Sequence, residues 1–146
     1  MLKVKIQKLH PDAILPRYAS AFAAGADLFC LPGSPVTVGP GETAVLRTGI
    51  AMEIPEGLVG LVYARSGLAT KQGLAPANKV GVIDADYRGE ILVSLYNQSS
   101  VPRTVEGGER IAQIVLTPYI TGEFVESECL SETGRGAGGF GSTGSK

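Results

Sequence analysis

Apolar positions along the chain predict short β-strands. Apolar and polar residues alternate at residues 2–6, and apolar residues recur at positions of one parity at 46–54 and 91–96, whereas residues 58–63 and 111–116 are almost continuously apolar. Gly and Pro recur between these runs, at Pro32-Gly33, Pro55-Glu56-Gly57 and Gly107-Gly108, where they favour turns. Many short strands at this spacing predict an all-β sandwich or barrel.

One helix and one unusual tail interrupt this pattern. Ser66–Gln72 is predicted to be a short helix, with Ser66 as its N-cap and Gly73 as its end. Six of the eleven residues Gly134–Gly144 are glycine, so this segment cannot form a core of its own. We therefore expect a β domain over residues 1–133 and a flexible C-terminal arm over residues 134–146.

The composition narrows the range of functions. A chain of 146 residues fits one domain, and a net charge of −1 argues against binding to nucleic acid or to a membrane surface. No apolar stretch approaches 18 residues and the N-terminus lacks a signal-peptide core, so we expect a cytoplasmic protein. A single histidine, His10, argues against a zinc site or a Ser–His pair. Cys30 and Cys129 are expected to be reduced thiols, with a disulfide between them as the alternative.

Two segments carry groups that suit phosphate chemistry. Arg65-Ser66-Gly67 opens the predicted helix, where free N–H groups, a guanidinium and a hydroxyl would favour an anion. The alternative is a capped helix with a surface arginine. The segment Gly81–Gly89 is predicted to be a hairpin in which Asp84 follows an apolar pair, is partly buried and acts as a general base. The alternative is a pair of turn-forming aspartates. Asp27 and Glu90 have the pattern of ordinary strand residues.

The tail contains Gly136–Gly141, which matches the GxGxxG pattern. No strand precedes it in a βαβ unit and no helix follows, so we reject a dinucleotide-binding fold. A lid that closes over a ligand, with Phe140 stacking on a base and Arg135 holding phosphate, is one explanation. A disordered tail is the other.

Together these segments resemble the dUTPase family (deoxyuridine triphosphatases), from Lys3 to Gly144. The counterparts of the five ordered motifs of that family are Ala24–Leu28, Arg65–Ala69, Gly81–Gly89, Gly108–Gln113 and Arg135–Gly144. Each segment alone is weak to moderate evidence, whereas five in order in one short chain are strong evidence. Ala64 and Ala26 depart from the family's usual proline and tyrosine, and neither position supplies a reacting group.

The resemblance implies a jelly-roll-like β fold and a homotrimer with active sites at the subunit interfaces. It also implies Mg²⁺-assisted hydrolysis of dUTP to dUMP and pyrophosphate, which would limit uracil in DNA and supply dUMP for dTMP synthesis. Asp84 would activate the water that attacks the α-phosphorus, and Asp27 would support Mg²⁺ through water. The substrate-binding residues implied are Arg65, Ser66, Gly67 and Gln113 for phosphates, Asn78, Gly81, Val82 and Ile83 for uracil, Tyr87 for deoxyribose, and Arg135, Phe140, Gly141, Ser142 and Thr143 for closure by another subunit's arm.

Two other functions compete with this one. A dCTP deaminase, which resembles the dUTPases in fold, would release ammonia from the base instead of pyrophosphate. A β-sandwich binding or capsid-like module with a disordered tail would bind nucleotide without turnover. The Gly-rich fifth motif and the Asp84–Tyr87 segment favour hydrolysis of dUTP.

Overall fold

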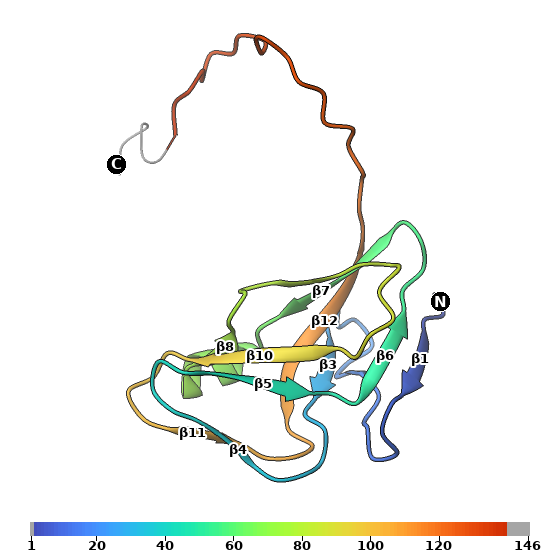
Figure 1. The fold of residues 1–146 in the computed structure, drawn as a ribbon, viewed down its shortest axis with the longest axis vertical. Helices are drawn as coiled ribbons and strands as arrows, with labels where there is room; N and C mark the ends of the chain where they lie inside the picture. Colours follow the sequence, from blue (N-terminus) through green and yellow to red (C-terminus); the bar gives the residue numbers. More distant parts are fainter. Residues whose placement is uncertain (1, 140–146) are drawn as a thin grey trace.

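The computed structural model describes residues 2–139, and its architecture is all-β and jelly-roll-like, as the sequence predicts (Figure 1). The strands of this region are β1 (Lys5–Lys8), β2 (Arg17–Tyr18), β3 (Ala26–Phe29), β4 (Val36–Val38), β5 (Thr43–Arg47), β6 (Ile50–Glu53), β7 (Leu58–Tyr63), β8 (Leu74–Pro76), β9 (Gly81–Ile83), β10 (Leu92–Asn97), β11 (Arg103–Val105) and β12 (Arg110–Pro118). One short helix, η1 (Leu68–Gln72), lies between β7 and β8.

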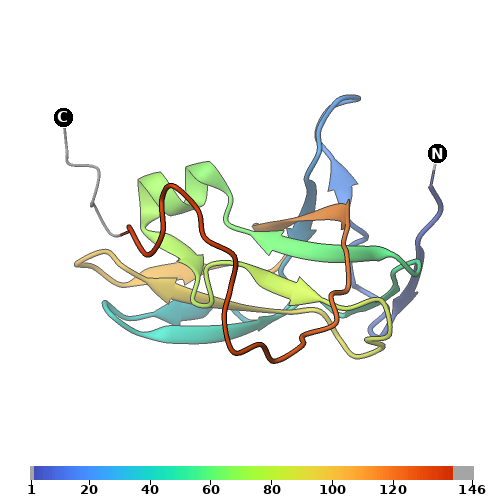
Figure 2. The same cartoon turned by 90° about the horizontal axis from the view of Figure 1, so that it is seen from above.

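The strands form four antiparallel sheets around one core. The largest sheet has the order β2-β3-β12-β7-β9, and a second sheet has the order β5-β10-β8. Two further pairs, β1-β6 and β4-β11, complete the structure. The sheet with β7 and β12 and the sheet with β5 and β10 lie as two layers (Figure 2), and buried residues from both belong to one hydrophobic cluster.

Side-chain alternation in the five-stranded sheet separates core from surface. Leu28, Ile114 and Val62 face inward and are at most 4% exposed. Their neighbours Asp27 and Gln113 pair across β3 and β12, and Gln113 pairs with Tyr63 of β7. Because successive residues of a strand face opposite sides, these polar residues share the outer face of the sheet.

The single long strand predicted over residues 46–54 is wrong, because the chain turns at Thr48-Gly49. Gly49 has φ +70°, a left-handed conformation that interrupts a strand. Before the turn β5 pairs with β10, and after it β6 pairs with β1. The shared parity of the apolar residues therefore spans two strands in different sheets.

The predicted hairpin over Gly81–Gly89 is also wrong. β9 pairs with β7, whereas β10 pairs with β5 and β8. The segment 84–91 is a loop that crosses from the five-stranded sheet to the three-stranded sheet. Apolar patterning predicted both strands but carries no information on which partner each strand takes.

The helical residues are those predicted, Ser66–Gln72, because η1 continues a helical turn that begins at Ser66, but the predicted cap is wrong. Gly67 already has helical dihedral angles and stands at the N-cap position, and no side chain caps the first turn. Ser66 is therefore not the cap. Gly73, with φ +71°, ends the helix as predicted.

Features outside the sheets also bear on the sequence predictions. Cys30 is buried, Cys129 is exposed and both are free thiols, as expected. No helix in the described region is long and apolar enough to cross a bilayer. Beyond β12 the chain leaves the sheets and runs as an extended, exposed segment (Figure 1).

Candidate active site

A hollow of about 540 Å³ lies on the outer face of the five-stranded sheet. Asp27, Gln113 and Tyr63 occupy adjacent positions on β3, β12 and β7 and form its floor. Arg65, Ser66 and Gly67, which follow β7, form part of its wall together with Arg110. Three segments far apart in the sequence, which the motifs predicted to act together, therefore meet in one place.

Two arginines share the Asp27 carboxylate. Arg65 Nε donates to Asp27 Oδ1 at 2.8 Å, and Arg110 Nη1 lies 3.3 Å from Oδ2. Arg65 Nη1 also donates to the Arg110 carbonyl at 3.4 Å. The Asp27 side chain is only 13% exposed, whereas those of Arg65 and Arg110 are 26% and 50% exposed. Two guanidinium charges against one carboxylate leave an excess of positive charge that suits a polyanion.

Gln113 fixes the chain that leads into the hollow. Its Nε2 donates to the Ala64 carbonyl at 2.9 Å, which holds the segment just before Arg65. Its Oε1 lies against Gly25, where a Cβ atom would overlap with it. A side chain at Gly25 would therefore displace the end of the Gln113 side chain, and Gln113 supports this corner from within the sheet.

Arg110 was missed as a site residue by the sequence reasoning. The register between β12 and β3 shifts between Arg110 and Ala112, which marks a β-bulge. A bulge changes the side on which the next side chain lies, so Arg110 reaches the same hollow as Gln113 although three positions separate them. The spacing of residues does not reveal a bulge. Arg110 could have been identified from the fourth motif, Gly108–Gln113, because it lies within that motif.

Asp84 lies in a different hollow. Val59 and Leu61 of β7 and Val82 of β9 line it, and Asp84 and Asp86 lie at its border. Asp84 is exposed, so the expectation of a partly buried carboxylate is wrong for the isolated chain. The apolar pair before Asp84 is at a sheet edge, where Val82 itself is 61% exposed. Within one chain, the structure does not bring Asp84 together with Arg65, Ser66 and Gln113.

The remaining predicted base and sugar residues lie near Asp84. Gly81, Val82 and Ile83 form β9, and Asn78 lies in the turn before it, with its side chain near Gly81. Tyr87 is in the loop after Asp84, and its hydroxyl donates to the Glu90 carbonyl at 3.0 Å. The predicted site residues thus form two groups. The group around Asp27 contains the residues predicted to bind phosphates, and the group around Asp84 contains those predicted to bind base and sugar.

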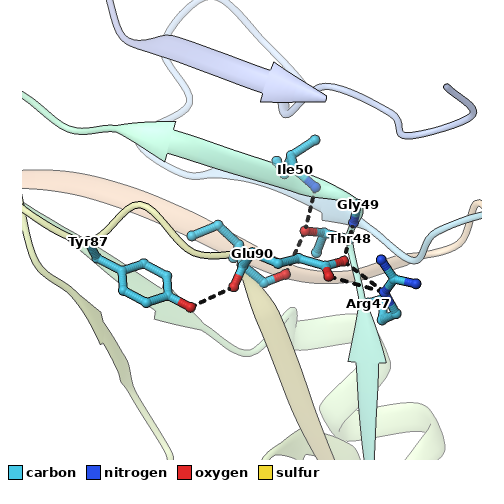
Figure 3. A network of polar contacts seen from close by, with 7 residues as sticks. Arg47, Thr48, Gly49, Ile50, Tyr87 and Glu90 are labelled. Atoms are coloured by element: carbon cyan, nitrogen blue, oxygen red, sulfur yellow. Dashed lines mark hydrogen bonds and ion pairs between the residues drawn. The ribbon is translucent and has the colours of Figure 1, made fainter. Parts of the chain in front are cut away.

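Glu90 is a second residue whose environment the sequence did not reveal. It was expected to be an ordinary strand residue, but its side chain is 17% exposed and paired with Arg47. Its carboxylate also accepts the Gly49 N–H at 2.8 Å (Figure 3). No sequence pattern links residues 47–49 to residue 90, because the contact joins the end of β5 and the turn after it to a loop more than 40 residues later in the chain.

The predicted arm is described only in part. Arg135 is exposed, and its Nε donates to the Gly138 carbonyl at 2.7 Å. Phe140, Gly141, Ser142 and Thr143 lie outside the described residues. Before Arg135, residues 119–134 are exposed throughout.

The side chains that line the hollow around Asp27 determine how a magnesium ion could bind there. Among residues 2–139 no cluster of three or more His, Cys, Asp or Glu side chains could hold a metal ion. Asp27 is the one carboxylate that lines the hollow, and both its oxygens already face arginines. Mg²⁺ commonly keeps several waters and binds through one or two carboxylates plus substrate phosphates. These residues fit an ion of that kind, with Asp27 reached through water, and do not fit an ion enclosed by protein ligands.

Comparisons with known proteins agree with this geometry. The family model for dUTPase matches residues 11–144. A deoxyuridine 5'-triphosphate nucleotidohydrolase from Desulfitobacterium hafniense is 53% identical, covering 98% of this chain and 97% of its own. One from a Hydrogenobaculum species is 49% identical, covering 99% and 100%.

Solved structures are similar over the same length. A dUTPase of Staphylococcus bacteriophage 80alpha, solved with dUpNHpp, matches with a TM-score of 0.89 at 30% identity and covers 99% of both chains. A dUTPase of phage phi11 of S. aureus, described with a structural Mg(II) ion, matches with a TM-score of 0.80 at 26% identity and covers 90% of this chain and all of its own. The motifs, the fold and the full-length similarity together show that this chain belongs to the dUTPase family of deoxyuridine 5'-triphosphate nucleotidohydrolases.

Proposed function

We propose that the protein hydrolyses dUTP to dUMP and pyrophosphate, with water attacking the α-phosphorus. The observation that carries the proposal is the hollow in which Arg65 and Arg110 are oriented by Asp27, beside Ser66 and Gln113. A triphosphate carries several negative charges, and fixed cationic donors stabilise them as charge moves to the leaving pyrophosphate. The names of the relatives and the dUpNHpp in the phage structure support dUTP as the substrate. In a cell this reaction would limit uracil in DNA and supply dUMP for dTMP synthesis.

Asp84 acts as the general base. Its carboxylate is exposed and can accept the proton of an attacking water. The turn and the strand beside Asp84 bind the base and the sugar of the nucleotide. Asn78 and the β9 backbone from Gly81 to Ile83 bind uracil, and the ring of Tyr87 packs against deoxyribose and leaves no room for a 2′-hydroxyl.

The complete site forms between chains of a homotrimer. Asp84 and the residues around Asp27 lie in separate hollows of one chain, and a second copy would bring the two together. Each hollow has an uncovered apolar side chain, Tyr63 with 36% and Val82 with 61% exposed. Exposed apolar side chains beside the two hollows suit a subunit interface.

The C-terminal arm closes the site of another subunit. The extended chain that leads to it exposes Ile120, Phe124 and Leu130 by 89% or more, so it has apolar side chains for which its own domain offers no cover. Arg135 then holds phosphate, Phe140 stacks on the base, and Gly141, Ser142 and Thr143 complete the closure.

Magnesium is the cofactor, and Asp27 would hold it through water, by accepting hydrogen bonds from waters of the ion, beside the phosphates of the substrate. When bound, Mg²⁺ neutralises phosphate charge and thereby makes the phosphorus easier to attack. The protein residues orient the triphosphate, since Arg65, Arg110 and Gln113 are already fixed by hydrogen bonds before substrate arrives.

The decisive experiment adds dUTP and Mg²⁺ to the purified protein and measures pyrophosphate, with dCTP and UTP as control substrates. We expect pyrophosphate and dUMP in equal amounts from dUTP and little from either control. Ammonia released from dCTP would indicate a deaminase instead. Tight binding of a dUTP analogue without turnover of dUTP would indicate a binding module.

A further inference from the structure

The loop that carries Asp84 and Tyr87 is fastened at one end to the turn between β5 and β6 (Figure 3). Glu90 Oε1 accepts the Gly49 N–H at 2.8 Å, and both carboxylate oxygens lie 3.1 Å from Arg47 Nε. The next residue, Ile91, accepts the Thr48 hydroxyl at 2.6 Å and donates its N–H to the Ile50 carbonyl at 2.9 Å. These bonds join two different sheets at the point where the loop enters β10.

The conformation of the turn directs the Gly49 N–H toward the Glu90 carboxylate. Gly49 has a left-handed φ of +70°, and a Cβ atom there would overlap with Leu31. The turn is therefore specific to glycine, and its N–H requires an acceptor because Gly49 is buried. The Glu90 carboxylate supplies that acceptor and is itself largely covered, with 17% of the side chain exposed.

Tyr87 is held by the same residue through the backbone. Its hydroxyl donates to the Glu90 carbonyl at 3.0 Å. Its ring lies directly on Gly89, where a Cβ atom would overlap with the hydroxyl and the ring carbons. The ring position therefore depends on where the backbone of residues 89 and 90 lies, and the bonds of the Glu90 carboxylate hold that backbone together with those of Ile91.

We propose that Glu90 is a positioning residue that sets the ring of Tyr87 against the sugar and thereby controls discrimination between deoxyribose and ribose. The inference rests on the proposed function, because it assigns Tyr87 to the sugar. The carboxylate of Glu90 touches no substrate in this assignment. It acts through Arg47 and the Gly49 N–H on one side and through its own carbonyl on the other.

The test uses two substitutions at one position. Glu90→Ala removes all bonds of the carboxylate, whereas Glu90→Gln retains one oxygen to accept the Gly49 N–H and loses the charge that pairs with Arg47. We expect Glu90→Ala to lower the ratio of kcat/KM for dUTP to kcat/KM for UTP by about tenfold or more. Glu90→Gln should retain most of the wild-type ratio. Tyr87→Ala should give the lowest ratio of the three variants, because it removes the ring itself.

This ratio separates positioning from a general loss of structure. A fraction of unfolded enzyme lowers the rates with both substrates equally and leaves their ratio unchanged. The matched control is Glu42→Ala, because the Glu42 carboxylate likewise accepts a glycine N–H, that of Gly39 at 3.0 Å, in a turn away from the Asp84 loop. We expect this control to lose stability without any change in the ratio.

An unchanged ratio in folded, active Glu90→Ala would overturn the inference while leaving the proposed function intact. If the wild-type protein does not hydrolyse dUTP, the proposed function fails, and amide hydrogen exchange still tests the positioning. In that measurement Glu90→Ala should speed exchange in residues 84–89 far more than Glu42→Ala does. Equal protection of this loop in the two variants would refute the role of Glu90.

Discussion

At the scale of single residues, the position of Asp84 decides what its carboxylate can do. It directly follows the edge strand β9, it is exposed, and Tyr87 N–H donates to its backbone carbonyl at 3.2 Å. The backbone is thus fixed while the carboxylate remains free to contact water. A group held in this way suits proton transfer better than a structural ion pair.

Asp84→Asn is expected to retain the fold and bind dUTP but lower kcat by about 10²- to 10⁴-fold, because an amide cannot accept the proton of the attacking water. Rapid-quench or pyrophosphate-release kinetics measure kcat, and binding of a non-hydrolysable dUTP analogue checks the retained affinity. A purified Asp84→Asn protein with near-normal kcat would exclude this residue as the base.

Cys30 links stability to pH. Burial raises the pKa of its thiol above the ordinary value of 9.0, and the negative charge of Glu109 adds to the effect. The unfolded chain therefore loses this proton near pH 9 while the folded chain still holds it, so the free energy of unfolding should fall as the pH rises above about 9. Urea unfolding at pH 8 and pH 10, in a non-thiol reductant, should show a larger drop for wild type than for Cys30→Ala. Equal drops would mean that other groups account for the alkaline loss.

The sequence predicted that Asp27, Arg65 and Gln113 act together, which agrees with their shared hollow, and it predicted the wrong exposure for Asp84. Asp27, Arg65 and Gln113 were found because three motifs contain them, and the structure brings them into one hollow. The partial burial of Asp84 was predicted wrongly, since an apolar pair such as Val82-Ile83 indicates burial only if both faces of its strand are covered. On β9 the outer face is open in the isolated chain, since Val82 is 61% exposed.

At the scale of elements, apolar patterning predicted where strands occur but not how they pair. The run over 58–63 became β7 with the predicted bounds, because a central strand is covered on one face and flanked on both sides. The pattern over 46–54 crossed a glycine turn, and β9 and β10 joined different sheets. Strand partners depend on contacts distant in sequence, and local periodicity does not encode them.

The ion pairs of Asp27 connect three elements, namely β3, the segment after β7 and the start of β12. Asp27→Ala leaves two guanidinium groups without their acceptor, so we expect the free energy of unfolding to fall by about 1.5–3 kcal/mol, as for hydrogen bonds to charged groups. The affinity for a dUTP analogue should also fall, because the arginines lose their fixed orientation. Chemical denaturation and calorimetric titration measure the two effects.

Glu53→Ala is the matched control for that prediction. The Glu53–Lys5 pair has a similar distance, 2.9 Å, but its side chains are 46% and 80% exposed. Exposed ion pairs contribute little because water and salt screen them. Loss of Asp27 that changed stability and affinity no more than loss of Glu53 would show that the shared carboxylate does not organise the hollow.

At the scale of the whole molecule, one chain carries the parts of the site without assembling them. The hollow around Asp27 and the hollow around Asp84 are separate, and the segment beyond β12 extends away from both sheets (Figure 1). The sequence motifs predict which residues act together. A motif does not say which copy of the chain contributes each residue to a given site. The resemblance implies active sites at subunit interfaces, and separate hollows within one chain are what that expectation requires.

The last prediction is that the arm from Gly134 serves a site whose Asp84 belongs to a different chain. The native mass by light scattering should first be near three times 15.1 kDa. One variant carries Asp84→Asn with an intact arm, and the other keeps Asp84 but ends after Thr133. Each homotrimer should be nearly inactive, because one lacks the base and the other lacks the residues that close the site. When the two are unfolded and refolded together, some mixed sites pair an intact Asp84 with an intact arm from another chain, so dUTP hydrolysis should reappear. If each arm instead closed over the Asp84 of its own chain, no mixed trimer would hold both parts in one site, and the mixture would stay as inactive as its components.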